Sequence, residues 1–522
     1  MSYDTVIVGA GASGAVLAAR WSQDTSRKVL LLEAGPDFPH PRDLPDEIRR
    51  AYGYAGIWAH AFGFDTRFGW GYRARSTDAN PDMFVPRGRI VGGSSAVNAQ
   101  IFLRGTPEDY DSWAAAGNDE WSFDRLLPYF RRIEADRDFD DDNHGVDGPI
   151  PVRRFSFDEC RTEHQAFYRA LRDRDVADCP DHNDPDSTGV GPLPLNSVDG
   201  LRWSAAMGYL TPEVRARANL EIRPDSHVRR LVVDQGRAVG IELEDGAGPD
   251  RIDGGEIVVC AGAIGSPHLL MRSGIGPAES LRALGVPVVA DLPGMGRNLR
   301  CHAQCGITVR ALPEFRPTGG EPPIQMGCRY TAAGSGLRND MFLHPASCAT
   351  VGGYYDATDT DFVGFFLVCA IYLAKGAGRI TLASADPSVH PRLDYNFLEE
   401  RSDLERMREG VRILLNLLDH AEYRPIVESP VNIFESDQAT DADLDRWIRK
   451  VVATSHHVSG TCKMGPDGDP LAVVDQFGNV RGVTGLRVAD ASIMHDCIRA
   501  NTNATTMVIG ERVADFMASG GR

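Results

Sequence analysis

The chain has 522 residues, of which 42% are hydrophobic and 25% are charged, so it can bury a large core and is not disordered throughout. Its 55 Lys and Arg residues stand against 73 Asp and Glu residues, which gives a formal net charge of −18. Because this charge repels polyanions, nucleic acid is not expected as a main ligand.

Neither a membrane span nor a secretory signal is expected. The longest uncharged apolar run, Phe362–Ala374, is too short to cross a bilayer as a helix and is typical of a buried strand. Ten cysteines are scattered without a Cys-x-x-Cys pair, which predicts reduced thiols and a cytoplasmic protein. Cys301, His302 and Cys305 lie close together, but without a second group of ligands they predict no metal site.

The N-terminal segment has the pattern of a βαβ unit. Thr5–Val8 and Lys28–Leu32 are apolar, β-branched or leucine-rich runs that predict parallel strands. Between them lie a glycine-rich turn, Gly9–Gly14, and a predicted helix, Ala15–Ser22. The turn reads Gly-x-Gly-x-x-Gly, which lets the backbone approach a pyrophosphate at a helix N-terminus. Glu33 follows the second strand, where a carboxylate binds the ribose of a dinucleotide.

The next segment, Pro36–Pro86, has no sustained period and is rich in glycine and aromatic residues. A loop of this length predicts either a lid or entrance wall for a substrate, or a surface belt packed on the core. Its aromatic residues are Tyr52, Tyr54, Trp58, Phe62, Phe64, Phe68, Trp70 and Tyr72.

Further elements follow in chain order. Helices are predicted at 124–134, with Ser122 as a candidate cap, and at 162–175, 266–272, 402–418, 441–452 and 505–517. Strands are predicted at 231–233, 238–244, 256–260, 362–372 and 379–382. The acidic stretch Asp136–Asp147 predicts a solvated loop.

Four further motifs occur in a fixed order after the glycine-rich turn. They are Arg87–Asn98 with its Gly92-Gly93 pair, Gly262–Gly276, His457–Gly465, and Gly485–Ser492 with the following Asn501–Asn503. Together they resemble the glucose–methanol–choline (GMC) family of FAD oxidoreductases, over nearly the whole chain.

The resemblance implies an α/β fold of two interleaved parts. One is a Rossmann-like, doubly wound FAD-binding domain, expected at 1–155, 196–308 and 446–522. The other is a substrate-binding domain built on an antiparallel sheet with flanking helices, expected at 156–195 and 309–445.

The resemblance also implies which residues hold FAD. The ADP half is expected on Gly9, Gly11, Ala12, Ser13, Gly14, Glu33 and Ala34, with the adenine on the backbone of Val228. The flavin ring is expected beside Val91, Gly92, Gly93, Asn98, Ala99, Gln100 and Ile101. The ribityl-phosphate region is expected at Asp490 and Ala491, and the pyrimidine edge at Thr502 and Asn503. Some members link FAD to a histidine at the position that is Val97 here, so a noncovalent flavin is implied.

His457 and Asn501 match the two catalytic positions of the family. A neutral imidazole can take a hydroxyl proton, and an amide can donate to the oxygen as charge develops. The base is expected to titrate between about pH 5 and 8. Asn501 has a second interpretation, because it precedes the last predicted helix and can cap it.

Other residues near these motifs are less specific. His456 lies where members carry an aromatic residue, and either lines the pocket or turns away; Phe366, in the apolar run, is a second candidate for lining the pocket. Arg499 is expected in a structural ion pair rather than on a substrate. His495 and Cys301 depart from the family's usual residues, with no evident role for His495.

The resulting hypothesis is an FAD-dependent alcohol oxidase or dehydrogenase that oxidises a primary, apolar or aromatic alcohol to the aldehyde by hydride transfer to flavin N5. Its electron acceptor is oxygen or another acceptor. The alternative is a non-oxidative flavoprotein of the same fold, such as a hydroxynitrile lyase or a light-driven decarboxylase.

Overall fold

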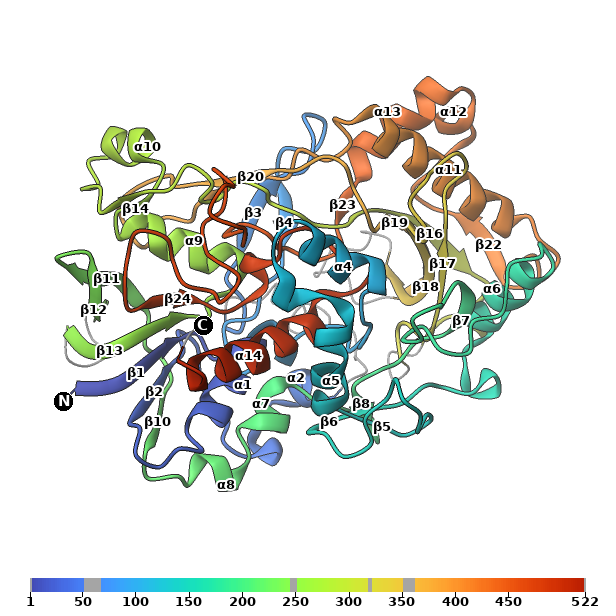
Figure 1. Ribbon diagram of the computed structural model, residues 1–522. Helices are drawn as coiled ribbons and strands as arrows, with labels where there is room; N and C mark the ends of the chain where they lie inside the picture. Colours follow the sequence, from blue (N-terminus) through green and yellow to red (C-terminus); the bar gives the residue numbers. More distant parts are fainter. Residues whose placement is uncertain (1, 51–66, 245–250, 318–321, 351–361, 521–522) are drawn as a thin grey trace.

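The computed structural model describes residues 2–50, 67–244, 251–317, 322–350 and 362–520 (Figure 1). Two large sheets organise these residues, one in the half of the molecule that holds the N-terminus and one in the opposite half. The predicted mixed α/β fold with two such parts is confirmed.

The first sheet has the order β10-β2-β1-β13-β12-β11, with β24 beside β13. Its strands are β1 (Ser2–Val8), β2 (Val29–Leu32), β10 (Leu220–Arg223), β11 (Val228–Asp234), β12 (Arg237–Leu243), β13 (Arg251–Val259) and β24 (Leu486–Val488). β1 pairs in parallel with β2 and with β13, so their carboxyl ends meet at one edge. In sheets of this kind a ligand binds in the crevice outside those ends.

Three helices follow strands or close the chain around this sheet. They are α1 (Ala12–Trp21), α9 (Gly262–Arg272) and α14 (Thr502–Ala518). Each starts earlier than predicted, by three or four residues, because a glycine-rich or polar first turn carries no hydrophobic period.

The second sheet is antiparallel, with the order β22-β16-β19-β18-β17-β7 and β23 beside β16. Its strands are β7 (Gly189–Pro192), β16 (Ala303–Ala311), β17 (Met326–Tyr330), β18 (Met341–Thr350), β19 (Phe362–Ile371), β22 (Val427–Pro430) and β23 (Ala453–Thr454). The helices α6 (Thr162–Arg172), α11 (Arg401–Leu418) and α13 (Asp441–Val451) pack against it.

The central strand β19 is buried on both faces, which explains its unbroken apolar sequence. On one face, Cys369 lies so close to α11 that a Cβ on Gly410 would be 3.1 Å from the Cys369 Cβ. On the other face, Ala370 lines the main cavity of the molecule. Side chains alternate along a strand, so the even-numbered residues share the cavity face.

The predicted division of the chain needs two adjustments. The expected boundary at residue 308 falls inside β16, which belongs wholly to the second sheet. The expected boundary at residue 445 falls inside α13, and β23, which follows α13, also belongs to the second sheet. We propose that the second part of the substrate-binding domain extends from Ala303 to Thr454.

The segment Pro36–Pro86 is not one continuous loop. It contains the strands β3 (Tyr72–Arg75) and β4 (Met83–Val85), which form a small sheet with β20 (Arg379–Thr381) and β21 (Arg392–Asp394). These strands are too short to show a period in the sequence. Five of the predicted lid aromatics, Tyr52, Tyr54, Trp58, Phe62 and Phe64, lie outside the described residues.

The remaining elements are short. The helices are α2 (Asp46–Arg49), α4 (Pro107–Ala115), α5 (Phe123–Ile133), α7 (Ala205–Tyr209), α8 (Pro212–Arg215), α10 (Ala278–Ala283) and α12 (Glu435–Gln438). The strands are β5 (Glu134–Asp136), β6 (Ile150–Val152), β8 (Ser197–Val198), β9 (Leu201–Arg202), β14 (Ile275–Gly276) and β15 (Ala290–Asp291). Ser122 occupies the position before α5, but its side chain makes no capping hydrogen bond.

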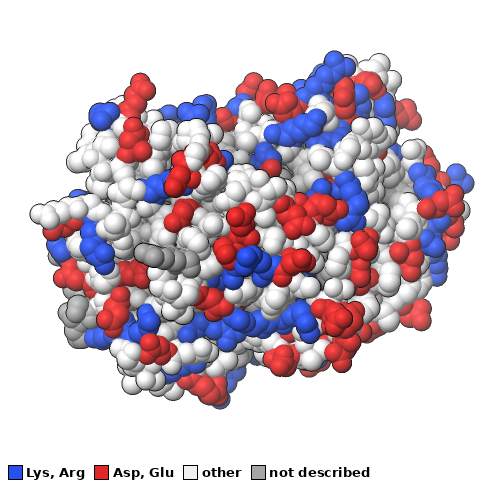
Figure 2. All heavy atoms as spheres, viewed as in Figure 1, with Lys and Arg blue, Asp and Glu red and all other residues white. Residues whose placement is uncertain are grey.

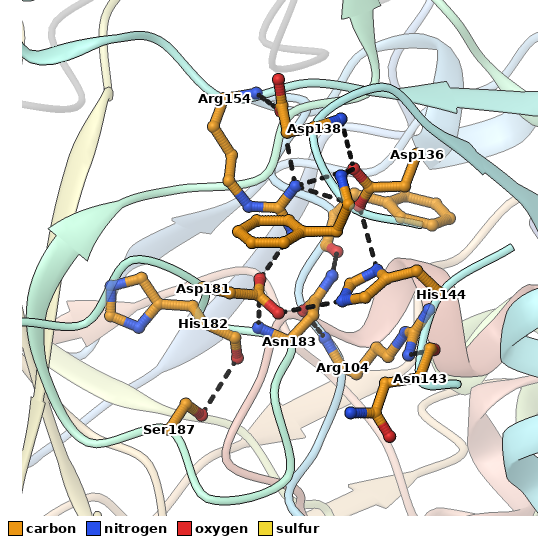
Figure 3. A network of polar contacts seen from close by, with 12 residues as sticks. Arg104, Asp136, Asp138, Asn143, His144, Arg154, Asp181, His182, Asn183 and Ser187 are labelled. Carbon is orange, nitrogen blue, oxygen red and sulfur yellow. Dashed lines mark hydrogen bonds and ion pairs between the residues drawn. The ribbon is translucent and has the colours of Figure 1, made fainter. Parts of the chain in front are cut away.

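The acidic stretch Asp136–Asp147 is not entirely solvated, which corrects the prediction. Asp136 and His144 are buried in a polar network (Figure 3). His144 contacts Asp136 at 3.1 Å through Nδ1 and Asp181 at 2.9 Å through Nε2. Arg154 pairs with both aspartates, at 2.9 and 2.6 Å. The sequence shows the charged residues of this stretch but not their burial, which depends on Asp181 from a later segment of the chain.

The surface carries both charges. On the face shown in Figure 2, acidic and basic side chains are interspersed rather than gathered into one patch. Among the helices of the described residues, none combines the length and the apolarity that crossing a membrane requires. All ten cysteines are free and buried.

Candidate active site

The cavity begins at the carboxyl ends of β1 and β2, where the glycine-rich turn forms a cradle. Gly9 has a φ of +103°, and a Cβ on Gly14 would lie 1.9 Å from the Gly9 carbonyl oxygen. Only glycine fits at these two positions, because the turn packs closely against the start of α1. A Cβ on Gly11 would meet nothing closer than 3.9 Å, so this position is open toward the cavity that it lines.

The second glycine motif packs directly on the first. Gly92 donates its N–H to the Ala10 carbonyl at 2.8 Å. Gly93 has a φ of +52°, and a Cβ there would lie 2.7 Å from the Gly11 Cα. The two motifs, far apart in the sequence, thus form one continuous backbone wall.

Glu33 is buried at the end of β2. Its two carboxylate oxygens accept hydrogen bonds from the backbone N–H groups of Ala10 and Gly35, both at 3.0 Å. Burial raises its pKa to about 7, although these N–H groups favour the charged form. Each oxygen keeps a further lone pair for a hydroxyl group of a ribose.

Most residues expected around FAD line this one cavity. They are Gly9, Gly11, Ala12, Ser13, Glu33, Ala34, Gly93, Asn98, Ala99, Gln100, Ile101, Val228, Asp490, Ala491, Thr502 and Asn503. Gly14, Val91 and Gly92 do not line it, and their contact with FAD stays a prediction.

Two observations at the far end bear on the fit of a flavin. Asn503 lies in the first turn of α14, and its buried Nδ2 has no hydrogen-bond partner among the described residues. A pyrimidine carbonyl would satisfy it. Asp490 is different, because its carboxylate already accepts from Gly262 N at 2.9 Å and from Ser266 Oγ at 2.5 Å. Asp490 therefore anchors the start of α9. With the glycine cradle and Glu33 at one end of the cavity and the unpaired Asn503 amide at the other, the residues present fit FAD.

The catalytic candidates meet in the same cavity. Asn501 Nδ2 lies 2.9 Å from His457 Nε2. Asn501 also occupies the N-cap position of α14, but its side chain makes no capping hydrogen bond. The structure thus places the amide on His457 instead of on the helix.

The other nitrogen of His457 contacts His302, which sequence reasoning did not assign to the site. The two Nδ1 atoms are 2.8 Å apart, and His302 Nε2 lies 2.8 Å from the Ile498 carbonyl oxygen. Burial lowers the pKa of His302 to about 3 and the pKa of His457 well below its ordinary value, so both rings are neutral at neutral pH. In the sequence, His302 stood out only by its position between Cys301 and Cys305, which pointed to no partner in the site.

His456 lines the cavity, whereas Phe366 does not. Phe366 points to the same face of β19 as Ala370, but it lies further along the strand, where the face no longer borders the cavity. In its place the wall contains Phe342, His344 and Tyr372. The sequence could not reveal these three, because strand pairing brings them together.

Arg499 forms the expected ion pair, with Asp109, and does not line the cavity. His495 Nδ1 contacts the Met464 carbonyl at 3.1 Å, and Cys301 Sγ lies 3.0 Å from Thr454 Oγ1. Both side chains thus have structural contacts outside the cavity.

A buried arginine joins the site to the polar network of Figure 3. Arg329 donates to the carbonyls of Arg104 and Arg499, at 2.8 and 2.9 Å. Arg104, which is labelled in Figure 3, pairs in turn with Glu134. Arg329, a residue of the substrate-binding sheet, therefore holds the backbone at Arg499, two residues before Asn501.

Glu134, Asp136 and His144 are the one group of potential metal ligands found among the described residues, and arginines already pair with its carboxylates.

Comparisons with known proteins agree with this geometry. Models of the GMC oxidoreductase N- and C-terminal regions match residues 3–304 and 374–510. The chain is 35% identical to a 5-(hydroxymethyl)furfural oxidase of Methylovorus sp., over 98% of both chains. It is 32% identical to an oxygen-dependent choline dehydrogenase of Rhizobium etli, over 99% of this chain and 96% of the other. The crystal structure of pyridoxine 4-oxidase from Mesorbium loti superposes with a TM-score of 0.88 at 30% identity, over 99% of both chains. The chain therefore belongs to the GMC oxidoreductase family and is an FAD-dependent enzyme that oxidises alcohol groups.

Proposed function

We propose that this enzyme oxidises a primary aromatic alcohol to the aldehyde, with His457 as the base that takes the hydroxyl proton. The observation that carries the proposal is the arrangement of His302, His457 and Asn501. FAD, when bound, accepts the hydride at its N5 atom.

The hydrogen bonds of the two histidines fix the position of each proton. The Ile498 carbonyl can only accept, so His302 Nε2 carries the proton of this neutral ring and its Nδ1 is an acceptor. His457 must then donate from Nδ1. Its Nε2 is left with a lone pair, which points at the Asn501 amide in the cavity.

This lone pair and the Asn501 amide form a matched pair for a hydroxyl group. A substrate hydroxyl takes the place of the hydrogen bond between these two atoms: it donates its proton to His457 Nε2 and accepts a hydrogen bond from Asn501 Nδ2. The hydroxyl proton passes to His457 Nε2 as the hydride leaves the carbon, and the C–O bond becomes the double bond of the aldehyde. Asn501 stabilises negative charge that develops on the oxygen.

The cavity favours an aromatic substrate because its substrate side is walled by Phe342 and Tyr372. The names of two relatives point the same way, since one is called a 5-(hydroxymethyl)furfural oxidase and the other a pyridoxine 4-oxidase. Both names denote ring alcohols.

The test is anaerobic mixing of the holoenzyme with benzyl alcohol and ring-substituted hydroxymethyl compounds. Loss of the oxidised flavin absorbance with formation of one equivalent of aldehyde is expected. A lyase would release aldehyde from a hydroxynitrile without bleaching the flavin, and a decarboxylase would need light, so either result would replace the proposal.

We further propose that FAD is bound without a covalent link, because Val97 lines the cavity where some members carry a linking histidine. Acid precipitation of the holoenzyme should leave all flavin in the supernatant. Yellow precipitated protein would contradict this.

A further inference from the structure

A row of three rings leads away from His457 along the substrate-binding sheet. Tyr372 lies edge-on to His457, with ring centroids 6.5 Å apart and an interplanar angle of 88°. Phe342 stacks on Tyr372 at 4.7 Å and 8°, and His344 follows at 5.9 Å from Phe342. All three rings line the cavity, and we call them the aromatic wall.

The far end of the aromatic wall presents a hydrogen-bond acceptor. His344 Nδ1 lies 3.1 Å from the Pro345 carbonyl oxygen, which can only accept, so Nδ1 carries the proton. Burial lowers the pKa of His344 to about 4, and the ring is neutral with a lone pair on Nε2. The residue is 8% exposed, and no donor among the described residues reaches Nε2.

The surroundings of this acceptor are neutral. Cross-strand pairing sets Gln304 opposite Ala370 and Ala370 opposite Phe342, and the small side chain of Ala370 leaves room between the larger ones. Ser455 donates to Gln304 Oε1 at 2.8 Å. The acidic residues that line the cavity, Glu33, Glu244 and Asp490, all belong to the FAD-binding side.

On the substrate-binding side, therefore, no carboxylate among the described residues lines the cavity to pair with a cationic substrate. Instead, Arg87 lines the cavity with a half-buried guanidinium, which donates to the His456 carbonyl. An alcohol that carries a quaternary ammonium group would lose its hydration there without gaining a counter-charge.

We propose that the substrate is a neutral, planar ring alcohol with a second hydroxyl or N–H group at the end remote from the reacting hydroxymethyl group, and that His344 Nε2 accepts a hydrogen bond from this second group. This inference rests on the proposed function. The reacting hydroxyl lies at His457, the ring lies along Tyr372 and Phe342, and the second donor reaches His344.

The experiment compares isosteric substrates that differ only in the second donor. 1,4-Benzenedimethanol and 4-ethylbenzyl alcohol differ by one hydroxyl in place of one methyl group; 2,5-bis(hydroxymethyl)furan and 5-ethylfurfuryl alcohol form a second pair. Anaerobic rapid mixing with the holoenzyme gives the flavin reduction rate and the substrate Kd for each. We expect the ratio of reduction rate to Kd to be about tenfold to hundredfold higher for the diol of each pair, since a desolvated acceptor left unpaired is costly.

Three variants test whether His344 causes this preference for the diol. His344→Phe keeps a flat ring but removes the acceptor, so the preference should fall to about one, mainly through the diol Kd. His344→Gln places an amide oxygen near the former Nε2 and should restore part of the preference. His420→Phe, a matched change outside the cavity, should leave the preference unchanged.

Each outcome has one meaning. If no alcohol reduces the flavin, the proposed function itself fails. If the wild type reduces diol and ethyl compounds equally well, or if His344→Phe keeps the preference with its flavin bound, the assignment of His344 is overturned while the proposed function stands. Reduction by choline at a rate similar to the diols would overturn the expected neutral substrate.

Discussion

Both nitrogens of His457 have assigned partners, and this decides which one can accept a proton. His302 takes the Nδ1–H of His457 because the Ile498 carbonyl fixes the proton of His302 on its other nitrogen. His302 therefore sets the tautomer of His457, the base of the proposed reaction, without needing contact with the substrate.

Replacing His457 by Ala should retain FAD and the fold but slow flavin reduction by about two to four orders of magnitude, the usual contribution of a general base. Stopped-flow reduction at saturating alcohol measures this. His495→Ala, whose ring bonds to Met464 away from the cavity, serves as the control. A wild-type rate in His457→Ala would refute the role of this residue.

The pH dependence of kcat/KM follows from the burial of His457. Burial and the neighbouring histidines lower its pKa well below the ordinary value of about 6.5, and the protonated form is the inactive one. We therefore expect kcat/KM to stay constant above about pH 6.5 and to fall only toward acid pH, in the lower part of the range predicted from the sequence. A rise that is centred above about pH 7 would contradict this.

Asn501 distinguishes catalysis from helix capping. Asn501→Ala should raise the barrier to flavin reduction by about 2.7–4 kcal/mol, as for the loss of an oxyanion donor, with little change in melting temperature. A capping role would give the reverse result, about 1 kcal/mol of lost stability at a normal rate. Asn501→His supplies another donor and should be faster than Asn501→Ala.

At the scale of elements, the site depends on where backbones touch. The carboxyl ends of β1 and β2 place the first glycine motif and Glu33 side by side, and the second motif closes on the first at Gly11 and Gly93. Side chains of the antiparallel sheet then face this wall from the opposite side of the cavity.

Two alanine substitutions in the first motif should have different effects. Gly14→Ala should destabilise the protein by about 1–3 kcal/mol, because its Cβ would overlap the Gly9 carbonyl oxygen. Gly11→Ala meets no close neighbour, so the apoprotein should melt near the wild-type temperature while flavin content falls, since the methyl group narrows the path to the pyrophosphate. Thermal melts and the ratio of flavin to protein absorbance measure both effects. Equal stability of the two apoproteins would contradict the close-packing argument for Gly14.

At the scale of the whole molecule, the buried polar network of Figure 3 couples stability to pH. Burial opposes the charge on His144, but hydrogen bonds to Asp136, Asp181 and Glu134 together outweigh it and raise the pKa of His144 to about 11. Because the folded pKa exceeds the unfolded value, the stabilisation is complete below about pH 6.5 and is lost as pH rises toward the folded pKa.

His144→Gln should therefore destabilise the protein more at about pH 7.5 than at about pH 9.5, by up to about 1.4 kcal/mol per pH unit. His164→Gln is the matched control: burial lowers the pKa of His164 to about 3, so its ring is neutral in both states above about pH 7.5. Denaturant titrations at the two pH values test this, and a constant effect of His144→Gln would show that His144 is uncharged in the folded protein.

Local sequence was sufficient to predict several parts of this protein. The glycine spacing with Glu33 predicted the cradle, the period of α11 predicted its buried face, and the family motifs predicted the places of His457 and Asn501. These features depend on residues near one another in the chain or on a pattern of fixed order, so the chain itself carries the signal.

Other features were decided only by the tertiary structure. Strand pairing across the second sheet put His344, Phe342 and Tyr372 on the cavity and left Phe366 outside it. Packing of distant segments gave His302 to His457 and buried His144 among carboxylates. A side chain's proton position, its pKa and the cavity that it faces are set by all the neighbours within a few ångströms, and most of these neighbours are remote in the sequence.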